Sequence, residues 1–274
     1  MNVSSRYRSA CLYVGSAVAA TFAIAAPAQA AAFSSVSGNF QIDFLSSPLE
    51  IGTFTDTDSN AVSGGGLIEV SGDADADFEV LSTGGVLEAS VFSSAEGSDG
   101  AFFGFSESLA LSDGLFSFEA DETFSFTFSG SLELNTEIDD AEQESAFASG
   151  EFGLFLLNES DPNAEQEFLQ IFTFLETLGS EEEPLIASQG NFDITSLDIT
   201  QALGGLEEFT RIDFAGTYSQ TFDSPTDIRL LEASLFSAVD VVADATEVPA
   251  PGVLWGVISV CGYGLLRRLR KLMA

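Results

Sequence analysis

The chain has 274 residues, of which 43 are acidic and eight are basic, and its formal net charge is −35 at pH 7. It has no histidine, and its two cysteines and single lysine lie near the ends. This composition excludes Ser-His-Asp triads, Cys-His dyads, Schiff-base lysines and His- or Cys-ligated metal sites in the body of the chain. All acidic residues fall between Asp43 and Glu247, where Arg211 and Arg229 are the only basic ones. Such a surface repels phosphate and attracts cations, so we expect no nucleic-acid partner.

Residues 1–30 have the features of a secretory signal peptide. Arg6 and Arg8 precede an apolar run over 10–26, and Ala28 and Ala30 form an A-x-A cleavage site. The pattern predicts a signal helix, export and cleavage after Ala30; the alternative is a permanent N-terminal anchor. Because the body lacks cysteine, the exported protein would have no disulfides and must be stabilised by its core.

Residues 31–243 predict an acidic all-β body, either an antiparallel β-sandwich or a jelly roll. Phenylalanine alternates with serine or threonine over 116–118 and 124–128, and Leu132 and Leu134 continue the period of two. The chain has 26 phenylalanines, nearly all of them in this body. Two sheets packed face to face would bury the phenylalanine side of each strand.

Turn signals and further strands complete the expected body. Glycines predict breaks between strands at 64–66, 84–85, 97–100, 113–114, 130 and 204–205. Later strands are expected at 192–194, 211–222 and 227–242.

Two patterns compete over residues 162–178. Asp161 and Pro162 suit the N-cap and first position of a helix, and the apolar residues from Phe168 to Leu178 follow helical spacing. The phenylalanines at even-numbered positions also fit the alternation of a strand. One short helix in this segment is therefore an expectation beside the strand.

Asp73, Asp75 and Asp77 form a D-x-D-x-D motif, which resembles the start of a calcium-binding loop. The sixth position of such a loop requires glycine, where this chain has Phe78, and the twelfth lacks glutamate. On a strand, the same three carboxylates would line a solvated face. Calcium is the one cofactor that the sequence suggests.

Carboxylate pairs are the remaining candidates for catalysis. Glu181–Glu183 and Glu207–Glu208 offer the paired acids that a glycoside hydrolase needs, although a solvated surface is the simpler interpretation in so acidic a chain. Arg211 and Arg229 are expected to pair with nearby carboxylates and to help set strand register.

The C-terminal tail has three parts. A linker over 244–252 contains Val248, Pro249, Pro251 and Gly252; an apolar segment follows over 253–266; and residues 267–274 include Arg267, Arg268 and Arg270. A helix over 253–266 would be about 21 Å long, shorter than a hydrocarbon core of about 30 Å. The basic end predicts a transmembrane helix with a cytoplasmic terminus and the body outside.

This tail resembles the PEP-CTERM sorting domain, with Ala250 at the position where that family most often has glutamate. Segments 124–132 and 214–222 are similar to segments of uncharacterised cyanobacterial PEP-CTERM proteins. The resemblance implies recognition by a membrane-embedded exosortase, which is a cysteine-dependent protease or transpeptidase. It also implies transient anchoring in the inner membrane and a role at the cell surface, in biofilm or in the exopolysaccharide matrix.

These observations predict a non-enzymatic protein of the cell envelope or extracellular matrix, processed near Pro249–Gly252. Exopolysaccharide and divalent cations are the expected partners beside the sorting enzyme. One alternative is a carbohydrate-binding module, for which Tyr218 or an exposed phenylalanine would supply the sugar contact. A second alternative is a carboxylate-based glycoside hydrolase. For the tail, the alternative is a plain single-pass anchor.

Overall fold

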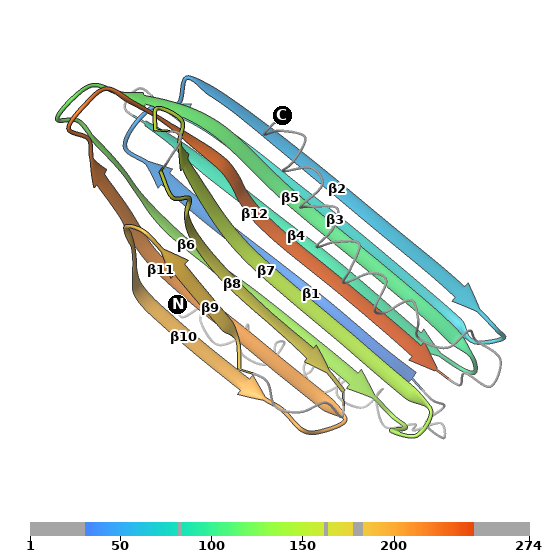
Figure 1. Ribbon diagram of the computed structural model, residues 1–274. Helices are drawn as coiled ribbons and strands as arrows, with labels where there is room; N and C mark the ends of the chain where they lie inside the picture. The colour runs from blue at the N-terminus through green and yellow to red at the C-terminus, as the bar shows by residue number, and fades with distance from the viewer. Residues whose placement is uncertain (1–30, 82–83, 162–163, 178–182, 244–274) are drawn as a thin grey trace, which may run out of the picture.

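The computed structural model describes residues 31–81, 84–161, 164–177 and 183–243, which form two antiparallel sheets packed as a sandwich (Figure 1). Sheet A, in spatial order, consists of β10 (Phe192–Ala202), β11 (Glu207–Thr221), β6 (Thr123–Ile138), β1 (Ala31–Phe44), β4 (Gly84–Ser98) and β3 (Leu67–Leu81). Sheet B consists of β2 (Glu50–Ser63), β5 (Phe102–Phe118), β12 (Thr226–Ala243), β7 (Glu144–Asn158), β8 (Glu167–Glu176) and β9 (Leu185–Gln189). The predicted all-β sandwich is confirmed.

The first and last strands lie at the centre of the fold. β1 pairs with β6 and β4 in sheet A, and β12 pairs with β5 and β7 in sheet B. β1 and β12 also pack against each other across the core. Because both sheets and the buried core from Ala32 to Ala243 are built from residues 31–243, we expect this segment to fold by itself.

The helix expected within 162–178 is wrong, because Glu167–Glu176 is strand β8. Its odd-numbered residues Leu169, Ile171 and Leu175 are buried in the core, while its phenylalanines face outward. A segment that is apolar on both faces satisfies helical and strand spacing equally well. Pairing with β7 on one side and β9 on the other decides in favour of the strand. Among the described residues, no helix is long and apolar enough to span a membrane.

One half of the core is aromatic, and the other half combines mainly aliphatic side chains with a layer of buried serines. Phe44, Phe116 and Phe124 lie with ring centroids 4.9–6.3 Å apart, and Phe126 stacks on Tyr218 at 5.0 Å. Toward the other end, Ser93 Oγ lies 2.9 Å from Ser237 Oγ, within a layer of buried serines. The sequence pattern predicted the aromatic half but not these serines. Ser93, Ser106 and Ser108 hydrogen-bond one another or backbone carbonyls, which offsets the cost of their burial, whereas Ser112 Oγ is buried without a partner among the described residues.

Two expected turns lie within strands. Asp113-Gly114 is part of β5, and Gly130 is part of β6. A Cβ atom at Gly130 would lie 2.6 Å from the Asn39 carbonyl oxygen of neighbouring β1, so glycine allows close strand approach there. The glycine signals at 64–66, 97–100 and 204–205 do mark connections between strands, and Gly65, Gly100 and Gly204 have positive φ angles.

The two outer surfaces of the sandwich differ in chemistry. Outward residues of β1 and β6 in sheet A are serine, threonine, asparagine, glutamine and acids over 35–43 and 125–137. About half of the outward residues of β5, β12, β7 and β8 in sheet B are large and apolar, with acids such as Glu107, Glu151 and Asp240 among them, and we call this surface the apolar outer face. Its half-buried members are Phe103, Phe105, Leu109, Leu111, Leu115, Phe147, Phe155, Leu157, Phe168, Phe172, Phe174, Phe236 and Val242.

Candidate functional site

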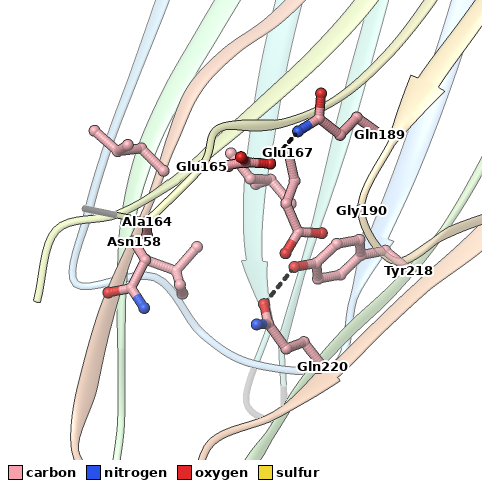
Figure 2. A pocket seen from close by; sticks show the side chains of 11 residues that line it. Asn158, Ala164, Glu165, Glu167, Gln189, Gly190, Tyr218 and Gln220 are labelled. Carbon is pink, nitrogen blue, oxygen red and sulfur yellow. Dashed lines mark hydrogen bonds between the residues drawn. The ribbon is translucent and has the colours of Figure 1, made fainter. Parts of the chain in front are cut away.

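A cavity of about 290 Å³ opens at one end of the sandwich, between the ends of β7, β8, β9 and β11 (Figure 2). It is positioned by the start of β8 and by the connection from β9 to β10, which bring polar side chains over the aromatic half of the core. Its lining consists of Leu156, Leu157, Asn158, Ala164, Glu165, Glu167, Gln189, Gly190, Tyr218, Gln220 and Ile228.

Tyr218 presents only its hydroxyl end to this cavity. The residue is only 1% exposed, because its ring stacks on Phe126 and contacts Phe124 and Phe192. The hydroxyl donates to Gln220 Oε1 at 2.6 Å, and Figure 2 shows it pointing toward the Glu167 carboxylate. The aromatic face of Tyr218, which the sequence left as one candidate for a sugar contact, is therefore covered by the core, and only its hydroxyl can reach a ligand.

Two carboxylates are held on the opposite wall by amide groups. Glu167 accepts a hydrogen bond from the Asn191 backbone N–H at 2.8 Å, and Glu165 accepts one from Gln189 Nε2 at 2.8 Å. Burial raises the pKa of the Tyr218 hydroxyl, and the negative charge of Glu167 raises it further. The hydroxyl thus remains a neutral donor beside amides and acids. The cavity is suited to hydroxyl-rich or cationic ligands and repels anions.

The aspartates of the D-x-D-x-D motif lie on β3 rather than in a loop. Asp73, Asp75 and Asp77 occupy alternate, exposed positions of the strand, so neighbouring members are separated by roughly 6.6 Å along it. Asp77 lies opposite Glu88 of β4, beside a shallow hollow over sheet A. Among the described residues, no group of three or more acidic, histidine or cysteine side chains is arranged to hold a metal ion. Calcium binding remains a prediction.

The carboxylate pair Glu207–Glu208 does not converge on one site. Glu207 is exposed on the outer face of β11, whereas Glu208 is buried on the inner face and accepts a hydrogen bond from the Gly204 N–H at 3.0 Å. Burial raises the pKa of Glu208, and its bond to the Gly204 backbone opposes that shift. Adjacent strand residues point to opposite faces, so this pair cannot act together as a hydrolase requires. Glu181 and Glu182 lie outside the described residues.

Both body arginines pair with acids, as the sequence predicted. Arg211 of β11 contacts Glu133 of the neighbouring strand β6 at 3.0 Å and Asp213 at 2.7 Å. Arg229 of β12 pairs with Glu159, at the start of the connection from β7 to β8. Arg211 and Glu133 lie opposite each other on paired strands, so their ion pair supports the register of β11 and β6. The ion pair between Arg229 and Glu159 holds the connection from β7 to β8 beside the cavity.

Two acids within the apolar outer face could not be singled out from the sequence. Asp240 of β12 lies between Phe105 and Phe147 of the flanking strands, and burial, followed by the charge of Glu176, raises its pKa to about 7. Glu151 of β7 accepts a hydrogen bond from Gln170 at 2.8 Å, and burial raises its pKa as well. Only the strand pairing reveals that these acids have aromatic neighbours.

The remaining predicted site residues lie outside the described residues. They are the signal cleavage residues Ala28 and Ala30 and the sorting residues Val248, Pro249, Pro251, Gly252, Arg267, Arg268 and Arg270. The chain matches no known protein family model and no curated protein.

Proposed function

We propose that this chain is an exported protein of the cell envelope or extracellular matrix that acts by binding rather than by catalysis. The position of the fold carries the proposal. β1 begins at Ala31, directly after the expected cleavage site, and β12 ends at Ala243, shortly before the motif that begins at Val248. The sandwich thus fills the stretch between the two expected targeting segments.

The charge and surface of the body support a role in a hydrated matrix. The window from Asp43 to Glu247 carries two arginines against 43 acids, and both arginines already pair with acids. Because acids so outnumber arginines, the body would attract cations, and these would bridge it to other anionic polymers. In this proposal, a membrane-embedded sorting protease or transpeptidase recognises the tail and releases the body from the inner membrane.

The test is the intact mass of the protein recovered from its own cell surface and medium. We expect a species that begins at Ala31 and ends between Pro249 and Gly252, with or without an added group. The matched control replaces Pro249 and Pro251 with alanine, which should leave the tail attached. A mature protein that retains residues 267–274 would show an ordinary anchor and would refute processing.

A second candidate function, carbohydrate binding, is favoured by the end cavity. Its hydroxyl, amide and carboxylate groups match the hydrogen-bonding needs of a neutral polyol, and Leu156 and Ile228 supply apolar contact. Isothermal titration of segment 31–243 with neutral oligosaccharides should detect binding that Glu165→Ala weakens. The control Ser129→Ala, on the outer surface of sheet A, should leave it unchanged. Equal binding by both variants would place any sugar site elsewhere.

A further inference from the structure

The apolar outer face presents thirteen large apolar side chains, interspersed with polar and acidic ones, on a surface that no described strand of the chain covers. One row of paired residues crosses it from β5 to β8 as Leu109, Phe236, Glu151 and Phe172. Within the face, the Phe147 and Phe174 rings stack with centroids 6.2 Å apart, as do those of Phe155 and Phe168. Large exposed apolar surfaces of soluble proteins are characteristic of interaction sites.

We propose that this face is a self-association surface, on which a second copy of the chain docks sheet against sheet. The two copies would be related by a two-fold axis, so that each contributes the same surface. Face-to-face packing at about 10 Å is the ordinary way in which two sheets bury apolar side chains. The inference does not depend on export or on processing of the tail.

The area of the face matches that of a stable dimer interface. Four strands spaced by about 4.8 Å, with 10 to 18 residues each at about 3.3 Å per residue, cover on the order of 900 Å². Specific interfaces bury about 800 Å² on each partner. Eight of the thirteen large apolar residues of the face are phenylalanine, and aromatic enrichment is expected at the centre of an interface.

Two other occupants fit less well. The apolar segment over 253–266, as a helix about 21 Å long and 10 Å wide, would cover only about 200 Å² of the face. An anionic bilayer is disfavoured because the body carries 43 acids and two arginines. A second copy covers the whole face, and added salt would screen the repulsion between two acidic bodies.

Sedimentation equilibrium of segment 31–243 over 1–100 µM in 0.15 M and 0.5 M NaCl tests the proposal. We expect a monomer–dimer equilibrium that salt shifts toward the dimer. Phe236→Arg, at the centre of the face, should weaken association by about 30-fold or more, the effect of removing a hot-spot side chain. Phe92→Arg is the matched control, since Phe92 is 40% exposed on the outer surface of sheet A. It should leave the dimer intact.

A second, milder variant distinguishes loss of association from loss of folding. Phe172→Ser removes an outward ring from β8 without adding charge, and it should also weaken the dimer while far-UV circular dichroism and thermal unfolding remain those of a folded sandwich. A monomer at 100 µM in 0.5 M NaCl, or a dimer unaffected by both variants, would overturn the proposal. Two other results would also overturn it. One is that a peptide of residues 253–274 binds the segment and converts the dimer to monomer; the other is that the segment binds zwitterionic vesicles and that this binding requires Phe236.

Discussion

Replacing Asp240 with asparagine should stabilise the sandwich at neutral and alkaline pH and flatten the pH dependence of its stability. Asp240 is half-buried on the apolar outer face, between Phe105 and Phe147, with Glu176 on the strand beyond. Burial, with a smaller contribution from Glu176, raises its pKa from 3.8 to about 7. The folded protein therefore binds this proton more tightly than the unfolded chain does.

The sign and size of the effect follow from proton linkage. A carboxyl whose pKa is raised by folding does not lower the free energy of unfolding at low pH, where it is protonated in both states. As the pH rises from about 4 to about 7, the folded protein loses stability, because the unfolded chain ionises more readily. At 1.36 kcal/mol per pKa unit, the full cost is about 4 kcal/mol above pH 7, of which about 2.5 kcal/mol appears between pH 5 and pH 8. These are upper values, because water still reaches part of the side chain.

Urea unfolding of segment 31–243, followed by circular dichroism at 1 µM protein and 0.5 M NaCl, measures the difference. High salt screens the general repulsion among the acids, which also weakens the fold as the pH rises. At pH 8, Asp240→Asn should raise the free energy of unfolding by about 2–4 kcal/mol, and the gain should shrink toward pH 5. Asp227→Asn, at an exposed position of the same strand, is the control. Equal pH slopes for the wild type and Asp240→Asn would refute the reasoning.

Three further predictions concern the core, the strand pairing and the surface ion pair. Phe124→Ala should cost about 3–5 kcal/mol in urea unfolding, because Phe124 is fully buried among aromatic rings; a loss below 1 kcal/mol would contradict that packing. Gly130→Ala should lower the melting temperature, since its Cβ would meet the Asn39 carbonyl oxygen at 2.6 Å, and an unchanged melt would argue against the β1–β6 register. Arg211→Gln should cost at most about 1 kcal/mol, with the loss vanishing in 1 M NaCl, because its ion pairs are exposed; a larger, salt-independent loss would count against this account.

Much of the fold could be predicted from residues that have only one favourable environment. In β6, Phe124, Phe126 and Phe128 alternate with serine and threonine, so only one face can enter the core. The ion pairs of Arg211 and Arg229 could be predicted because each arginine has many carboxylates nearby and only the other arginine as a competing cation in the body. The signal peptide and the sorting tail rest on composition and motif alone, and the mass measurement described above tests them.

The candidate site was less predictable because its side chains come together only through pairing of distant strands. The sequence left Tyr218 as one candidate for a sugar contact, yet Phe126 of the neighbouring strand covers its ring and leaves only the hydroxyl at the cavity. The cavity itself joins residues of β7, β8 and β11, which are separated by tens of positions in the chain. No local motif connects Glu165 with Gln220.

By itself, then, the sequence determined that the body is acidic, disulfide-free and all-β, because charge, cysteine content and period-two alternation are local properties. Only the tertiary structure decided how the ambiguous segments are used. β8 is apolar on both sides, and its hydrogen-bonded neighbours made it a strand and turned its phenylalanines outward. The same pairing placed Asp240 among aromatic rings and assembled the apolar outer face from four strands. Such a surface is a property of strand order, which depends on contacts between residues far apart in the chain.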